Sequence, residues 1–404
     1  MKSLKILVLN SGSSSIKCQY FIGTESMASL LLERIGEEKS HAEIRYINGK
    51  ITYKKSIPDH HAALNLIFSM LLETKVLTNI DDLDSVGHRV VHGGDRFKSS
   101  VRIDEEVIEN IRSLIPLAPL HNPANLDGIE ILYDAYPKLQ QVAVFDTAFH
   151  QSIPEYAYQY PLPYAFSQEN HIRRYGFHGT SHAYVAKEAA NMLGEELNTL
   201  NLITLHLGNG ASVTAIKAGK SIDTSMGFTP LEGLMMGTRS GDIDPAIIPY
   251  LERNKKMSIQ EIDNMLNKES GLKGICGSND MREVLERAAQ DDTEAKLALE
   301  MYVYRIQKYI GAYTVALGHV DALVFTGGIG ENATVLREMV CDGLYESIGL
   351  SLDFGKNSEE QKHDREIQSK KSKIKLLVIA TNEELAIVLQ IQKINKSIQD
   401  ILEN

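Results

Sequence analysis

The clearest signal in the chain is a set of short, continuous apolar runs that each end in polar or glycine residues. They are KILVLN (5–10), VAVFDT (142–147), NLITLHLGNG (201–210), DALVFTGGIGEN (321–332) and IKLLVIATNEE (374–384). Continuous runs of this length predict strands buried on both faces of a parallel or mixed sheet, and hence an α/β fold. Because ligands of such sheets gather beyond the carboxyl ends of the strands, these polar strand ends predict one shared site.

Two further segments have their apolar residues at helical spacing. The segment ATVLREMVCDGLYESIG (333–349), which follows a glycine turn in GGIGEN (327–332), predicts one helix. The C-terminal segment ELAIVLQIQKINKSIQDILEN (384–404) predicts an amphipathic helix that packs against the fold. No apolar run approaches the ~18 residues of a membrane-spanning helix, and no small-residue cleavage site follows the N-terminus, so we expect neither a membrane span nor a signal peptide.

The first strand leads into the turn LNSGSSSIK (9–17), in which Gly12 stands among four serines. Small residues after a strand let several N–H groups and hydroxyls point at one anion, so the turn predicts a phosphate site. The turn does not match a P-loop, which needs a second glycine, a Lys-Ser or Lys-Thr pair and a following helix. The strand-forming residues CQYFI (18–22) instead predict a β-hairpin.

The segment GNGASVTAIK (208–217) has the same form as NSGSSSIK and comes about 200 residues later. Two such hairpins predict two related domains that face each other. The alternative is that turns of Gly, Ser and Asn occur twice by coincidence. At roughly 100–200 residues per domain, the 404 residues of the chain agree with two or three domains.

The amino-acid composition indicates which kinds of partner and cellular location to expect. The chain is 43% hydrophobic and 24% charged, as in an ordinary globular protein, and its net charge of -11 argues against nucleic acid as the main partner. Cys18, Cys276 and Cys341 lie far apart and show no metal-binding spacing, so we expect a reducing, cytoplasmic location.

Histidine and arginine gather in short loops beside glycine or proline. These loops are GHRVVHGG (87–94), PLAPLHNPAN (116–125), FDTAFHQSIP (145–154), RRYGFHGTSH (173–182) and MGTRSGDIDP (236–245). A lone buried histidine is usually a hydrogen-bonded core residue, but several of them in such loops predict one common site. No histidine pair has zinc-ligand spacing together with a third ligand on a helix, and GTSHA (179–183) is not a Gly-x-Ser-x-Gly nucleophile elbow.

Arginines, a histidine, carboxylates and glycine turns together fit phosphoryl transfer. That reaction requires positioning and neutralisation of charge spread over three phosphoryl oxygens, usually with Mg²⁺. Arginine suits the task because its guanidinium stays charged and presents a planar fork of donors.

The chain resembles the acetate kinase family, within the superfamily of sugar kinases, actin and heat-shock chaperones. The resemblance rests on VLNSGSSSIK, GHRVVHGG, FDTAFH, RRYGFHGTSH, HLGNGAS, DTSMGFTPLEGLMMGTRSGDIDP, FTGGIGEN and TNEE, which occur in the family's order from Asn10 to Glu384. It implies an α/β fold of duplicated ribonuclease-H-like (actin-like ATPase) domains, with mixed sheets flanked by helices and the active site in the interdomain cleft. The implied domains are 1–149 with a returning C-terminal helix, 386–404, and a nucleotide-binding domain, 150–385.

The resemblance also assigns residues to the nucleotide and the metal. Asn10 stands at the catalytic centre and, with Glu383 of TNEE, is implied as a ligand of Mg²⁺, for which Mn²⁺ is an alternative. The residues implied for ATP or ADP come from the two hairpins and from SNDMRE (278–283) and GGIGEN; they are Lys17, His206, Gly208, Asn209, Gly210, Asp280, Met281, Arg282, Gly328, Ile329, Gly330 and Asn332.

For the other substrate, the resemblance implies that Arg89 and Arg239 hold the carboxylate and the moving phosphoryl group. His178 is implied to donate a hydrogen bond to that group, Asp146 to support the site, and His121 to make a secondary contact. The implied pocket for the acyl methyl group is formed by Val91, Leu120, Phe177 and Pro230.

The implied reaction is Mg²⁺-dependent, in-line attack of acetate on the γ-phosphoryl group of ATP, reversible, giving acetyl phosphate and ADP. Acetate is already ionised near neutral pH, so the nucleophile needs no general base, and Asp146 is expected to organise the site. Alternatives are a kinase for propionate or another short-chain acid, a pyrophosphate-dependent variant and a non-catalytic nucleotide switch. The resemblance further implies a homodimer, with neither nucleic acid nor membrane as a partner.

Overall fold

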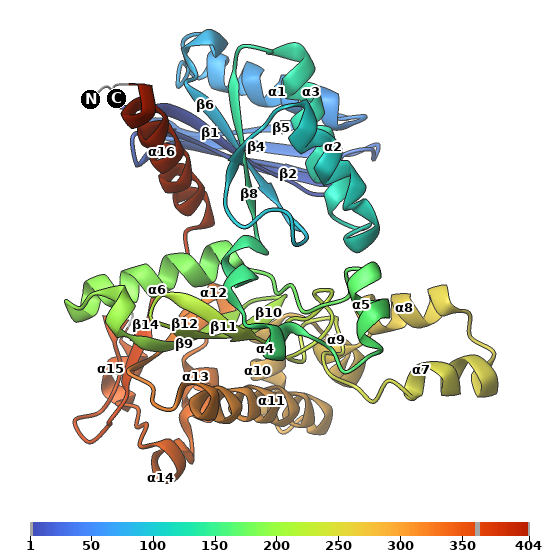
Figure 1. The fold of residues 1–404 in the computed structure, drawn as a ribbon, viewed down its shortest axis with the longest axis vertical. Helices are drawn as coiled ribbons and strands as arrows, with labels where there is room; N and C mark the ends of the chain where they lie inside the picture. The colour runs from blue at the N-terminus through green and yellow to red at the C-terminus, as the bar shows by residue number, and fades with distance from the viewer. Residues whose placement is uncertain (1–2, 360–363, 403–404) are drawn as a thin grey trace. The chain divides into compact units, whose positions relative to one another are not determined.

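The computed structural model describes residues 3–359 and 364–402. By its internal contacts the chain divides into two compact units, Met1–Ala148 with Asn382–Asn404, and Phe149–Thr381. Each unit contains a mixed β-sheet flanked by helices (Figure 1), which confirms the predicted α/β class. Within the described residues, no helix is both long and apolar enough to cross a bilayer.

The sheet of the first unit has the strand order β5-β4-β3-β2-β1-β6-β8-β7. Strands β1 to β5 form an antiparallel meander, whereas β1, β6 and β8 run parallel to one another. The strands are β1 Lys5–Ser11, β2 Ser15–Ile22, β3 Glu25–Glu33, β4 His41–Tyr46, β5 Gly49–Lys54, β6 Ser85–Val90, β7 Val101–Arg102 and β8 Gln140–Phe145.

Both faces of this sheet are buried, as the continuous apolar runs predicted. Along β1, Ile6 and Val8 pack with the C-terminal helix α16 (Glu383–Leu402), while Leu7 and Leu9 pack in the cluster that contains α1 (His60–Glu73). Helices α2 (Glu105–Ser113) and α3 (Asn122–Ala135) pack on β6 and β8. The predicted C-terminal helix is therefore present and packs on the first unit.

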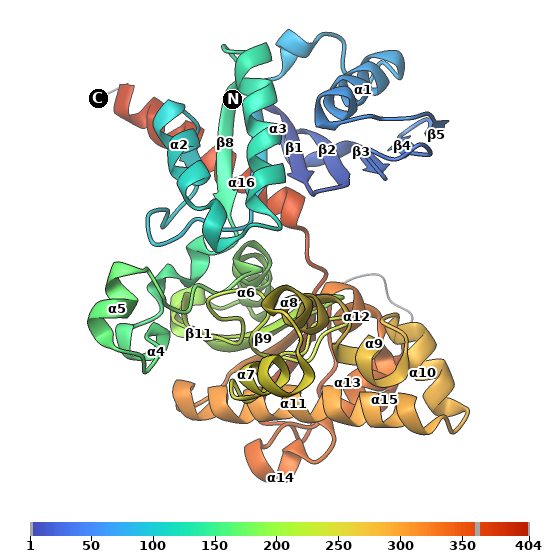
Figure 2. The same ribbon diagram turned by 90° about the vertical axis from the view of Figure 1, so that its right-hand side faces the viewer.

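The sheet of the second unit has the order β11-β10-β9-β12-β14-β13. Its strands are β9 Asn201–Leu207, β10 Ala211–Lys217, β11 Lys220–Thr224, β12 Ala322–Thr326, β13 Arg365–Glu366 and β14 Lys375–Val378. Helix α6 (Gly179–Leu193) lies on one face and the long helix α11 (Thr293–Leu317) on the other, as both ribbon views show (Figures 1 and 2).

Shorter helices complete the second unit. They are α4 Glu155–Tyr158, α5 Tyr164–Glu169, α7 Ile247–Tyr250, α8 Ile259–Lys268, α9 Gly271–Cys276, α10 Met281–Ala289, α12 Gly327–Asn332, α13 Thr334–Cys341, α14 Leu344–Ile348 and α15 Phe354–Ser358.

The two sheets repeat one topology. In the first unit an antiparallel series, β3-β2-β1, continues into the parallel strands β6 and β8; in the second, β11-β10-β9 continues into β12 and β14. Both small-residue turns join the first two strands of their series as hairpins. The repeat seen in the sequence is therefore a structural duplication.

The sequence prediction was wrong for the segment after β12. GGIGEN does not stay an open turn but forms α12, because the left-handed Gly327 (φ +77°) redirects the chain against the backbone of Leu207 and Glu331 accepts a hydrogen bond from the Gly327 N–H. The single helix predicted for 333–349 is divided into α13 and α14. Helix α13 ends at the extended Asp342 (ψ 135°), and Gly343 (φ 72°) adopts a left-handed conformation before α14 begins.

The packing of α16 generates a stability prediction. A Cβ on Gly87 of β6 would lie 2.5 Å from Cγ2 of Ile387 and 2.7 Å from Cδ1 of Ile391. Gly87→Ala should therefore overpack this contact and lower the free energy of unfolding by roughly 1–3 kcal/mol. Urea denaturation followed by circular dichroism measures it, since the chain has no tryptophan.

The matched control is Gly311→Ala in α11, where nothing lies within 4 Å of the added Cβ. That variant should gain roughly 0.5–1 kcal/mol from helix propensity. Equal stability of Gly87→Ala and wild type would contradict the observed packing.

Candidate active site

A partly buried ion pair lies at the carboxyl edge of the first sheet. Arg89, near the end of β6, donates from Nε to both carboxylate oxygens of Asp146 at 3.1 Å and from Nη2 to Oδ2 at 2.7 Å. Asp146 directly follows β8 and is 1% exposed. The guanidinium and the carboxylate therefore hold each other in one orientation.

Two more predicted residues adjoin this pair. Oδ1 of Asn10, on β1, lies 3.4 Å from Nη1 of Arg89, and Oε2 of Glu383, the first residue of α16, lies 3.8 Å from its Nε. Burial alone would lower the pKa of Arg89, but Asp146, Glu383 and Glu384 raise it above its usual value. Arg89 therefore remains a cation, in surroundings with an excess of negative charge.

Sheet register explains why these residues meet. In the parallel ladders Leu9 pairs with His88, and Val90 pairs with Phe145. Asn10, Arg89 and Asp146 adjoin these pairs and therefore reach the same edge of the sheet. Lys17 lies opposite Asn10 in the antiparallel hairpin of β1 and β2.

The predicted apolar and histidine positions of the first unit lie on the segments after β6 and before α3. Val91 is buried, and its N–H donates to Oδ1 of Asn125 at 3.0 Å. Leu120 is 55% exposed, and His121 is the N-terminal flanking residue of α3. Asn125, to which the sequence motifs assign no role, links this segment to the first hairpin by donating to the carbonyl of Ser11 at 2.6 Å.

In the second unit, histidines gather at the start of α6 and on β9. His178 and His206 stack with ring centroids 4.2 Å apart. Ser212 Oγ lies 2.9 Å from Nδ1 of His178 and 2.7 Å from Nε2 of His182. Burial, followed by His150 and His206, lowers the pKa of His182 well below its usual value, so His182 is neutral.

The backbone of His178 is itself unusual. It has φ 56° and ψ 23°, the left-handed region that a non-glycine residue seldom adopts. Such strain persists only where the surroundings fix it, and it is frequent at functional sites. This observation, which the sequence could not supply, singles out His178 within the cluster.

His150 supports Phe177 beside the cluster. Its Nε2 must carry the proton, because it lies 2.9 Å from the carbonyl oxygen of Phe177, which can only accept; Nδ1 lies 2.9 Å from Oγ of Ser221. Complete burial lowers the pKa of His150 to about 4.

Arg239 is brought next to His178 at the second hairpin. A Cβ built on Gly210 would lie 3.5 Å from both Nη1 of Arg239 and Nε2 of His178, so both side chains adjoin one point. Nη1 of Arg239 donates to the carbonyl of Pro230 at 3.3 Å. Burial lowers the pKa of Arg239, and within the described residues no carboxylate pairs with it.

A cavity of about 710 Å³ opens at the second hairpin, a size typical of small-molecule sites. Most of the residues expected at the nucleotide line it, namely Gly208, Asn209, Asp280, Met281, Arg282, Gly328, Ile329 and Asn332. The sequence motifs did not identify three further lining residues, Asn279, Leu285 and Ala333. Gly330 is buried away from the wall, where its carbonyl accepts from Nη1 of Arg337.

Asn209 and Asp280 are fixed within this cavity. The Asn209 carbonyl accepts from the Gly237 N–H at 3.0 Å, and its Oδ1 lies 3.3 Å from Nδ2 of Asn279. Asp280 caps α10 and accepts from Arg282; this hydrogen bond lowers the pKa of Asp280 to about 2.

These features define a duplicated α/β protein with a hairpin of small residues on each sheet. The model of the acetokinase family matches residues 5–389, so the chain belongs to that family. This confirms the resemblance carried by the sequence motifs.

Individual relatives agree over nearly their whole length. The chain is 61% identical to the acetate kinase of Sulfurovum sp. over 391 residues, covering 97% of this chain and 99% of that one. The crystal structure of Porphyromonas gingivalis acetate kinase superposes with a TM-score of 0.92 at 43% identity, covering 97% and 99% of the two chains. A propionate kinase from Francisella tularensis has a TM-score of 0.90 at 46% identity, covering 96% and 98%.

The buried histidine generates a pH prediction. An unfolded histidine takes up its proton near pH 6.5, whereas His150 in the fold does so only near pH 4. The unfolded state therefore binds more protons as pH falls from 6.5 to 4, and His150 should account for a loss of about 3 kcal/mol in unfolding free energy over that window. His150→Asn should remove this part of the pH dependence in urea titrations.

The control is His61→Asn, which makes the same replacement at an exposed position. An unaltered slope in His150→Asn would contradict a buried, neutral His150.

Proposed function

We propose that this chain transfers the γ-phosphoryl group of ATP to acetate, reversibly, giving acetyl phosphate and ADP. The observation that carries the proposal is Arg239, a partly buried cation beside His178 and Gly210 that has no carboxylate partner among the described residues. An unpaired charge that is partly withdrawn from water is costly, so a ligand is expected to supply the negative charge. Arg89 differs, because three carboxylates already surround it.

His178 is proposed to donate to the phosphoryl group. One assignment of protons satisfies its network: Nε2–H of His182 donates to Ser212, the Ser212 hydroxyl donates to Nδ1 of His178, and Nε2 of His178 carries a proton. That proton and Nη1 of Arg239 then converge on the space beside Gly210. Two convergent donors stabilise charge on phosphoryl oxygens as it develops in the transition state.

Asp146 is proposed to orient Arg89 and not to act as a base. Both of its oxygens accept from the guanidinium, and acetate has no proton to lose near neutral pH. Oriented in this way, Arg89 would hold the acetate carboxylate, for which a guanidinium fork is well suited.

The cavity of about 710 Å³ is proposed to hold the adenosine, with Lys17, His206 and Gly210 contacting the phosphates. Val91, Leu120, Phe177 and Pro230 are proposed to contact the acyl methyl group.

Asn10 and Glu383 are proposed to hold Mg²⁺, or Mn²⁺ in its place. Both offer oxygen donors in the acidic surroundings of Arg89, which suits a hard cation. The described residues contain no cluster of three or more His, Cys, Asp or Glu side chains for a metal, and Mg²⁺ needs none, because it keeps waters and phosphate oxygens as ligands. Bound Mg²⁺ neutralises phosphate charge.

The competing activity is that of a propionate kinase, as the relative from Francisella tularensis is named. One methylene in a pocket is worth only ~1–3 kcal/mol, so the two acids are close competitors. The chain is also proposed to form a homodimer in the cytoplasm.

The direct test is a hydroxylamine trap for acyl phosphate, run with MgATP and acetate, propionate or butyrate in separate reactions. The proposal predicts hydroxamate from all acids that fit, with the highest kcat/KM for acetate. A higher kcat/KM for propionate would change the substrate, and tight ATP binding without any hydroxamate would support a nucleotide switch.

Arg239→Ala is the negative variant in this assay and should lose at least about 10²-fold in kcat, the scale of one charge-stabilising donor. Arg112→Ala is its control, because that arginine pairs with Glu109 and Glu130 on the surface. Wild-type turnover in Arg239→Ala would contradict the proposed role.

A further inference from the structure

A histidine of helix α1 forms a hydrogen bond with the tip of the first hairpin, Gly12–Ser15. His60 Nε2 lies 2.8 Å from the carbonyl oxygen of Gly12. A carbonyl oxygen can only accept, so Nε2 carries the proton and donates it. No motif of the sequence points to this contact, which joins residues 48 positions apart.

The position of His60 is well defined. It is the first residue of α1, directly after Asp59, whose side chain caps the helix by accepting from the N–H of Ala62 at 2.7 Å. Helix α1 is anchored in the core of the first unit by Leu64, Ile67 and other buried residues. The imidazole is therefore presented from a rigid element.

The hydrogen bond fixes the direction of the next amide. In a planar trans peptide the C=O of one residue and the N–H of the following residue point in opposite directions. With the Gly12 carbonyl directed at His60, the Ser13 N–H must point away from α1. Ser13 is exposed, so this donor is available to a ligand.

Two neighbouring carbonyls of the hairpin also accept hydrogen bonds from the protein. The carbonyl of Ser11 accepts from Nδ2 of Asn125 at 2.6 Å, and that of Ser14 accepts from the Ile35 N–H at 3.0 Å. The carbonyls of Ser11, Gly12 and Ser14 therefore all accept hydrogen bonds from the protein. With these carbonyls directed at protein donors, the loop can present N–H groups to an anion.

We propose that His60 is a positioning residue for phosphate binding: its hydrogen bond to Gly12 holds the Ser13 N–H ready for a nucleotide phosphate. The proposal rests on the proposed function. His60 acts through the loop and does not itself touch substrate.

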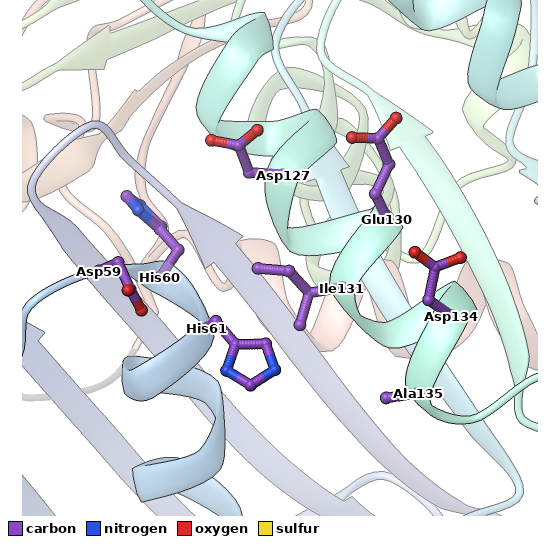
Figure 3. A pocket seen from close by; sticks show the side chains of 8 residues that line it. All are labelled: Asp59, His60, His61, Asp127, Glu130, Ile131, Asp134 and Ala135. Atoms are coloured by element: carbon purple, nitrogen blue, oxygen red, sulfur yellow. The ribbon is translucent and has the colours of Figure 1, made fainter.

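The adjacent histidine provides a matched control. Figure 3 shows His60 and His61 on the wall of one cavity of about 660 Å³, with their rings pointing in different directions. The ring of His61 has a partner on its own helix, with Nδ1 3.1 Å from Nδ2 of Asn65. Replacing His61 removes the same ring from the same helix end but leaves Gly12 held.

The kinetic test compares His60→Ala, His60→Gln and His61→Ala in the hydroxylamine assay. Loss of one such hydrogen bond changes an equilibrium by about fivefold, so His60→Ala should raise KM for MgATP at least about that much and leave KM for acetate unchanged. His60→Gln keeps an N–H donor and should recover most of the loss, while His61→Ala should match wild type. Unchanged KM for MgATP in His60→Ala, or equal effects on both substrates, would overturn the proposal.

A second readout does not depend on turnover. Amide hydrogen exchange of the peptide spanning residues 9–20, without nucleotide, should become faster in His60→Ala only, with β6 and α3 unaffected. Faster exchange across the whole first unit would mean a general structural role and would overturn the proposal. If wild type formed no hydroxamate, the proposed function would fail, and this local exchange would still decide whether His60 holds the loop.

Discussion

The site of the first unit depends on one partly buried ion pair, that of Arg89 and Asp146. Three hydrogen bonds join Arg89 to Asp146, and the carboxylate in turn is fixed at the end of β8 in the sheet. Glu383 and Asn10 approach the same guanidinium, so the ends of three parallel strands and the start of α16 meet around one cation. Without Arg89 these carboxylates would lose the cation that they share.

The second unit holds the opposite electrostatic arrangement. Arg239 is partly buried without a carboxylate partner in the described chain, and Ser212 links the neutral His182 to His178 beside the same space. One unit therefore carries surplus negative charge around an oriented guanidinium, suited to a metal ion, and the other carries uncompensated positive charge, suited to phosphate. Transfer of a phosphoryl group from ATP to a carboxylate needs surroundings of both kinds. The geometry of each unit is therefore what membership of the acetokinase family leads one to expect.

The sequence predicted the strands of the continuous apolar runs, both hairpins and the C-terminal helix, because each has a local signature: a continuous apolar run, a turn of small residues or helical spacing. Most residues of the cavity wall were expected only from the resemblance to the acetate kinase family. It failed where long-range contacts decide the outcome. GGIGEN becomes helical because Glu331 bonds back to Gly327, and Gly330 turns away because buried Arg337 takes its carbonyl. The contacts of Asn125 with Ser11 and of His60 with Gly12 span 114 and 48 positions, so no local pattern reveals them.

The measurement that tests the central claim most directly is a double-mutant cycle on kcat/KM with Arg89→Ala, Asp146→Ala and the double variant. If Asp146 acts through Arg89, removing it from the Arg89→Ala enzyme should change kcat/KM by no more than about twofold, although it is costly in wild type. If the two losses multiply, Asp146 has a role of its own, such as that of a base, and the claim that it serves only to orient Arg89 is wrong.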